Sequence, residues 1–137
     1  MIDILRSLIE ERTPHNCALG LRLVDTTPRA ATCTLPYSGA LVGDEETGAI
    51  HAGAISTLMD VTSGAAVLMR LQRVQGIATL DLRIDYLRPA GSGRPLTATA
   101  ECYKVVGSMA FVRAVAHDGD AVDPVAASQA TFILVED

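Results

Sequence analysis

The chain has 137 residues, enough for one domain with a substantial core and too few to favour a second. Its 16 acidic and 11 basic residues give a net charge of −5, so it lacks the positive field that attracts nucleic acid. The charged, amphipathic start of the chain resembles neither a signal peptide nor a membrane span. We therefore expect one cytoplasmic domain, residues 1–137, with no nucleic-acid or membrane partner.

Cysteine and histidine residues give no sign of a metal site or a disulfide framework. The three cysteines are odd in number and widely spaced, which is typical of reduced, buried thiols. No two of the three histidines stand four residues apart, as paired zinc ligands on a helix would. We expect no metal.

The first half of the chain predicts helices and one hairpin. Residues 2–12 have apolar side chains at helical spacing, which predicts a short leading helix. Residues 19–26 and 29–35 are predicted to be two strands of a hairpin, and residues 36–50 a loop. Residues 54–71 are mostly apolar, lack proline and suffice for roughly five helical turns. They predict a buried central helix.

The second half predicts four strands, at residues 78–86, 96–102, 109–117 and 126–135, separated by turn-forming residues. The first of them alternates, and its predicted inner face carries Ala78, Leu80, Leu82, Ile84 and Tyr86. A run of strands with one segregated helix predicts an α+β fold in which an antiparallel sheet wraps around the helix.

Asp60 is the acidic residue within the apolar stretch that predicts the central helix. Burying an ionised carboxylate without a partner costs several kcal/mol. Asp60 is therefore paired, protonated, exposed at a seam, or retained for chemistry. An interface or edge position is about as frequent for such a residue as a catalytic one, so the residue alone does not decide.

Motifs around Asp60 carry a family resemblance. The segment from Gly48 to Gly53 contains His51, Asp60 follows nine residues after that histidine, and Arg88-Pro89-Ala90 follows a predicted strand. This combination resembles the hotdog-fold acyl-CoA thioesterases of the phenylacetic-acid-degradation type, over about residues 15–135. The resemblance implies the hotdog fold, an antiparallel sheet around one long helix, and hydrolysis of an acyl-CoA. Coenzyme A is then part of the substrate, and no separate cofactor is expected.

The same resemblance implies roles for particular residues. Asp60 would be the general base or the nucleophile, with Thr79 orienting the attacking water. Backbone N–H groups near Ala52 and Gly53, at the start of the helix, would bind the oxyanion. Many relatives carry Asn or Gln where this chain has Glu45, and an ionised carboxylate there would repel the developing charge unless it is turned away or protonated.

Other candidates for substrate contact carry weaker signals. His51 is better explained as a residue at the helix entry than as a catalyst. The remaining candidates are cations that could grip the phosphates of coenzyme A and the turn residues beside them: Arg88, Pro89, Arg94, Lys104, Gly107 and Ser108.

The spacing of Ala52 and Asp60 predicts an oligomer. Eight residues of helix separate them by roughly 12 Å, too far for one chain to use both on one carbonyl. Two helices packed antiparallel across a two-fold axis would bring Asp60 of one chain to Ala52 of the other. We expect a homodimer as the minimum, and the resemblance implies a homotetramer.

Two other functions stay open: a non-catalytic acyl-CoA binding module, and a hotdog hydratase or dehydratase. The sequence does not choose the acyl group, nor between base and nucleophile for Asp60.

Overall fold

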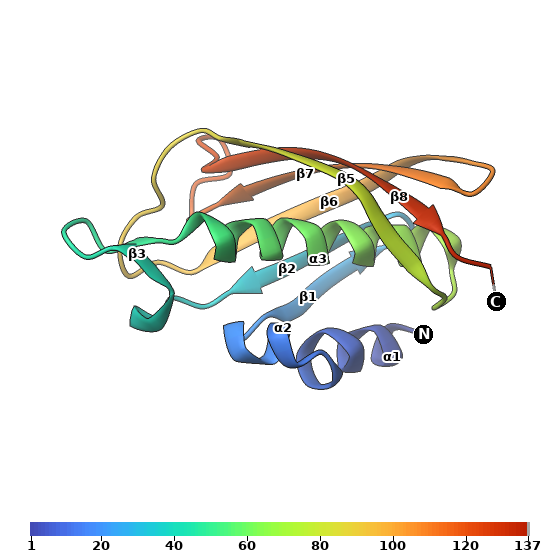
Figure 1. Ribbon diagram of the computed structural model, residues 1–137, viewed down its shortest axis with the longest axis horizontal. Helices are drawn as coiled ribbons and strands as arrows, with labels where there is room; N and C mark the ends of the chain where they lie inside the picture. Colours follow the sequence, from blue (N-terminus) through green and yellow to red (C-terminus); the bar gives the residue numbers. More distant parts are fainter. Residues whose placement is uncertain (137) are drawn as a thin grey trace.

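A six-stranded antiparallel sheet curves around one long helix in the computed structural model, which describes residues 1–136 (Figure 1). The sheet order is β1-β2-β6-β7-β8-β5. The strands are β1 Arg22–Thr27, β2 Ala30–Leu35, β5 Ile77–Tyr86, β6 Leu96–Val106, β7 Met109–His117 and β8 Ala126–Leu134. The central helix is α3, Ala52–Leu71. The predicted α+β hotdog fold is confirmed.

Helix α3 packs against β2, β6 and β7 through small side chains. Alternate residues of β6 and β7, among them Ala98, Ala100, Ala110 and Ala116, are fully buried, which lets the sheet approach the helix closely. By length and composition α3 would suffice to cross a membrane, but 61% of its most apolar window is buried within the molecule. That degree of burial is typical of the core helix of a globular domain.

The N-terminal region forms helices beside α3 (Figure 1). Helix α1, Ile2–Ser7, continues into the π-helical segment η1, Leu8–Arg12, and helix α2 spans Pro14–Leu19. The prediction of a strand from residue 19 is wrong at its start. Pro14 occupies the first turn of α2, and Gly20, with φ +74°, ends that helix in the left-handed conformation that glycine favours.

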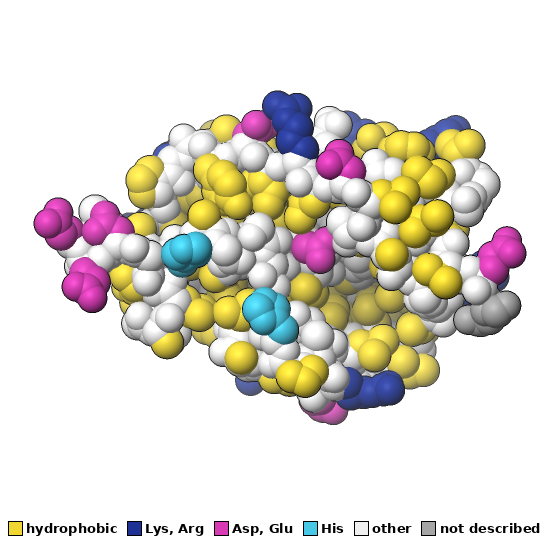
Figure 2. Space-filling view, viewed as in Figure 1, with side chains coloured by type: hydrophobic (Ala, Val, Ile, Leu, Met, Phe, Trp, Pro, Cys, Tyr) yellow, Lys and Arg dark blue, Asp and Glu magenta, His cyan; other side chains and the backbone are white. Residues whose placement is uncertain are grey.

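The segment predicted as a loop contains regular structure. It holds the 3-10 turn η2, Gly39–Leu41, and a small hairpin of β3, Val42–Asp44, and β4, Ala49–Ile50. The acidic residues at the hairpin tip project from one end of the molecule (Figures 1 and 2).

A β-bulge changes the face pattern of β5. Pairing with β8 shifts between Thr79 and Asp81, so that Leu80 is an extra residue in the strand. Leu80, predicted on the inner face, is 54% exposed, whereas Thr79 faces α3. The prediction that Leu80 shares a face with Leu82 is therefore wrong, because the bulge inverts the alternation at this point.

Candidate active site

Asp60 is half-buried on the side of α3 that faces away from β2 and β6. The hydroxyl of Thr79 donates a hydrogen bond to Asp60 Oδ1 at 2.7 Å. In the described chain, Asp60 Oδ2 has no hydrogen-bond partner. The carboxylate of Asp60 is therefore paired through one oxygen and open to solvent through the other.

The start of α3 offers one free backbone donor. His51 is the N-cap, and its Nδ1 accepts a hydrogen bond from the Gly53 N–H at 2.8 Å. The expectation that the N–H groups of both Ala52 and Gly53 are unpaired is therefore wrong for Gly53. Ala52 is exposed, and among residues 1–136 its N–H has no partner.

Three adjoining cavities follow α3 along this face. The first, about 360 Å³, lies at the helix start beside His51 and Thr57. The second, about 540 Å³, shares Thr57 with the first and contains Asp60 and Thr79. The third, about 300 Å³, shares Asp60 and Thr79 with the second. Figure 2 shows this face hollowed between the central helix and the N-terminal helices.

Helix α2 contributes two polar residues that sequence reasoning missed. His15 Nε2 lies 3.3 Å from Thr57 Oγ1 and lines the first two cavities. Asn16 is only 6% exposed and lines the second and third, beside Asp60. The available signal was Pro14, which is typical of a helix's first turn.

Several predicted contact residues lie away from the cavities. Glu45 is exposed at the hairpin tip, Lys104 is exposed near the end of β6, and Gly107 and Ser108 are exposed at the β6–β7 turn. None of these residues lines any of the three cavities. Arg94 is exposed in the β5–β6 loop.

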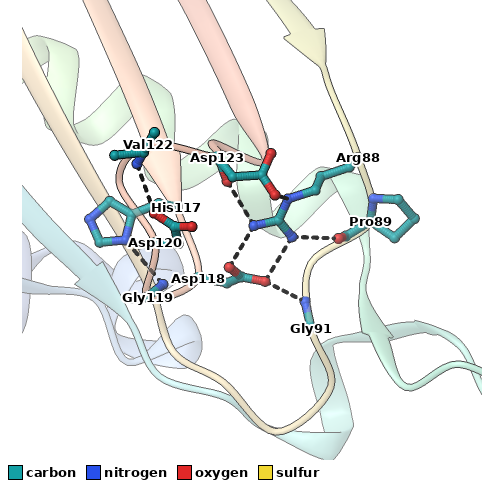
Figure 3. A network of polar contacts seen from close by, with 9 residues as sticks. All are labelled: Arg88, Pro89, Gly91, His117, Asp118, Gly119, Asp120, Val122 and Asp123. Atoms are coloured by element: carbon teal, nitrogen blue, oxygen red, sulfur yellow. Dashed lines mark hydrogen bonds and ion pairs between the residues drawn. The ribbon is translucent and has the colours of Figure 1, made fainter.

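Arg88, predicted to bind phosphate, is instead engaged within the chain (Figure 3). Its two terminal nitrogens donate to both carboxylate oxygens of Asp118, at 3.0 and 2.8 Å, and to the carbonyls of Pro89 and Asp123. Asp118 also accepts from the Gly91 N–H at 2.7 Å. These contacts use the four terminal N–H groups, so Arg88 joins two loops and has none of them left for a phosphate.

The paired charges alter each other's titration. The hydrogen bonds from Arg88, followed by that from the Gly91 N–H, lower the pKa of Asp118 well below its ordinary value of 3.8. The hydrogen bond to Asp118 in turn raises the pKa of Arg88. Both groups are charged across the physiological range.

Comparison with known proteins gives a consistent family match. The model of the thioesterase superfamily matches residues 47–125, which include His51, Asp60 and Thr79. The medium/long-chain acyl-CoA thioesterase YigI of Salmonella typhimurium is 31% identical over 134 residues, covering 88% of this chain and 85% of the relative.

Solved structures share the fold of this chain. A Pseudomonas aeruginosa protein superposes with a TM-score of 0.87 at 35% identity, covering 97% of this chain and 98% of that one. The Escherichia coli PaaI protein from the phenylacetic acid degradation operon has a TM-score of 0.81 at 18% identity, a likeness of fold that covers 94% and 89%.

Proposed function

The chain belongs to the thioesterase superfamily, and we propose that it is an acyl-CoA thioesterase that releases a medium- or long-chain fatty acid and coenzyme A. The observation that carries this proposal is the carboxylate of Asp60, held by Thr79 through one oxygen while the other faces a cavity. The proposed length of the acyl group follows that in the name of the YigI relative.

In the proposed reaction, Asp60 acts as a general base. Its free oxygen removes a proton from water as the water oxygen attacks the thioester carbonyl carbon. The tetrahedral oxyanion then collapses, the C–S bond breaks, and the leaving sulfur of coenzyme A takes the proton back from Asp60. Thr79 is a positioning residue, because its hydrogen bond holds the carboxylate in the orientation that this proton transfer needs.

The oxyanion would be bound by the N–H of Ala52 in a second subunit. That donor is unpaired and stands at the positive end of a 20-residue helix. Within one chain it lies roughly 12 Å along the helix from Asp60. A homodimer with antiparallel α3 helices would complete two equivalent sites, and a homotetramer stays a prediction.

Two observations favour this function over the alternatives. Glu45 is exposed at the hairpin tip and lines none of the three cavities. Its carboxylate is therefore turned away from the cavities, where it would not repel an oxyanion. His51 uses its Nδ1 to cap α3, which argues against the Asp–His dyad of a hydratase. Arg94 and Lys104, both exposed, remain the candidates for the phosphates of coenzyme A.

Release of free thiol from a panel of short, medium, long and aryl acyl-CoA thioesters tests the proposal. Asp60→Asn should lower kcat/KM by at least about a hundredfold, the scale of a lost general base. Asp81→Asn is the matched control, because Asp81 is an exposed acid on β5, the strand of Thr79, and has no side-chain hydrogen bond in the described chain. Coenzyme A binding without turnover by the wild type would support a binding module instead. Full activity of Asp60→Asn would overturn the mechanism.

A further inference from the structure

Gly64 lies in the interior of the central helix, one turn beyond Asp60. Glycine in a helix interior lowers helix stability relative to alanine, so its presence calls for a structural reason. Its backbone is helical and has no positive φ. A Cβ at this position would lie 3.5 Å from Ile77 Cδ1 and 3.6 Å from the Phe132 ring, which are ordinary contacts. Neither backbone conformation nor close packing requires glycine here.

The absent side chain instead leaves space in the third cavity, of about 300 Å³. Asp60, Gly64 and Leu68 stand four residues apart and form one stripe of α3 along that cavity. The stripe changes from a carboxylate at one end to an aliphatic side chain at the other. Such a cavity fits a ligand with a polar reacting head and an apolar tail.

The N-terminal segment forms the opposite wall of the cavity. Leu5 and Ile9 line it and are 2% and 5% exposed, so they are held firmly in the core, while Leu8 is half-buried. Phe132 of β8 also lines the cavity. The family match begins at residue 47, so this wall comes from a part of the chain outside the matched region.

We propose that this cavity is the acyl-tail site, with the tail running past Asp60 and over Gly64 beneath the N-terminal helices. Gly64 then sets the width of the site, and Leu8 forms part of its wall. The site prefers long, unbranched aliphatic tails to short ones, because only a longer tail reaches the apolar end and displaces water from it. This inference rests on the proposed thioesterase function and adds where the acyl group lies.

Variants on opposite walls test the site through opposite effects. Gly64→Ala should lower the ratio of kcat/KM for dodecanoyl-CoA to that for butanoyl-CoA about tenfold, the scale of one misplaced methyl group in an apolar pocket. Because alanine favours the helix, Tm should be kept or raised, which separates narrowing from misfolding. Leu8→Ala should increase activity toward branched or longer tails relative to dodecanoyl-CoA.

A binding measurement separates failure of this inference from failure of the proposed function. The Kd of dodecanoyl-CoA is measured in an Asp60→Asn background, with and without Gly64→Ala. If Gly64→Ala weakens binding but the wild type shows no turnover, the tail-site inference stands and the proposed thioesterase activity is overturned. Turnover with an unchanged chain-length profile in both Gly64→Ala and Leu8→Ala would overturn the tail site and leave the thioesterase.

Discussion

The hydrogen bond between Thr79 and Asp60 joins β5 to α3 at the proposed reaction centre. We predict that Thr79→Val, which keeps the shape and removes the donor, lowers kcat about tenfold with little change in KM. A freed carboxylate would sample orientations that do not face the water, and a tenfold loss corresponds to the energy of one hydrogen bond. Steady-state kinetics on the preferred acyl-CoA measure both constants.

Thr79→Ser should restore most of kcat, because it returns the hydroxyl. Thr99→Val provides a matched control, since Thr99 Oγ1 lies 3.0 Å from Thr32 Oγ1 on other strands, and its kcat should stay at the wild-type level. If Thr79→Val also retained the wild-type kcat, Thr79 would have no positioning role.

At the residue scale, the motif could be predicted from the spacing of His51 and Asp60, but the orientation of the side chains could not be predicted from the sequence. A helical acid nine residues after a histidine identifies the motif, whatever the rotamers. Which N–H is free at the helix start depends on the His51 ring turning back to cap Gly53. Asn16 and Gly64 belong to the cavities only through packing between distant segments.

At the scale of elements, the ion pair of Arg88 and Asp118 connects the loop after β5 to the loop after β7 (Figure 3). We predict that Asp118→Asn lowers Tm by several degrees at neutral pH, because it leaves the partly buried Arg88 without its bidentate partner. Thermal denaturation followed by circular dichroism measures the difference from wild type.

The same pair predicts a pH dependence. The pKa of Asp118 is lower in the folded than in the unfolded chain, so folding favours the ionised form. Its contribution to stability is fully present above the ordinary value of 3.8 and is lost as the pH falls below it toward the folded pKa. The Tm gap between wild type and Asp118→Asn should therefore narrow on acidification from pH ~7 to ~3. A gap that stays constant, or equals that of the exposed control Asp81→Asn, would contradict the prediction.

Elements were predictable where local period and composition suffice. The apolar stretch of α3 and the alternation of β6 and β7 identify their elements because burial of one face requires those patterns. The bulge at Leu80 could not be predicted, because an apolar residue in an alternating run gives no sign of an extra residue, and pairing with β8 creates it. Helix α2 was obscured because Leu19, Leu21 and Leu23 alternate like a strand across its end.

For the whole molecule, β5 and the outward side of α3 are two adjoining surfaces that the fold leaves open. Strand β5 is at the edge of the sheet, so one row of its backbone groups lacks a strand partner in the described chain. Leu80 is exposed on that strand, and the cavities that contain Asp60 open beside it. A second copy related by a two-fold axis would cover this face and bring the proposed donor and base together.

Subunit hybrids test whether Ala52 and Asp60 of different chains share a site. Ala52→Pro removes the N–H at the first helical position, where proline is well tolerated, and His51 before it has the extended backbone that proline requires (φ −60°, ψ 137°). Each of Ala52→Pro and Asp60→Asn should be inactive as a pure homodimer. A purified hybrid of the two has one intact site out of two and should regain about half of the wild-type activity.

The reciprocal hybrid makes the result decisive. It pairs a wild-type chain with a chain that carries both Ala52→Pro and Asp60→Asn, so it has the same mutations in another arrangement. If sites form between chains, each of its two sites contains one defect, and the hybrid is inactive. If Ala52 and Asp60 of one chain worked together, this second hybrid would keep about half of the activity and the first would have none. The two arrangements thus predict opposite outcomes from dimers of identical composition.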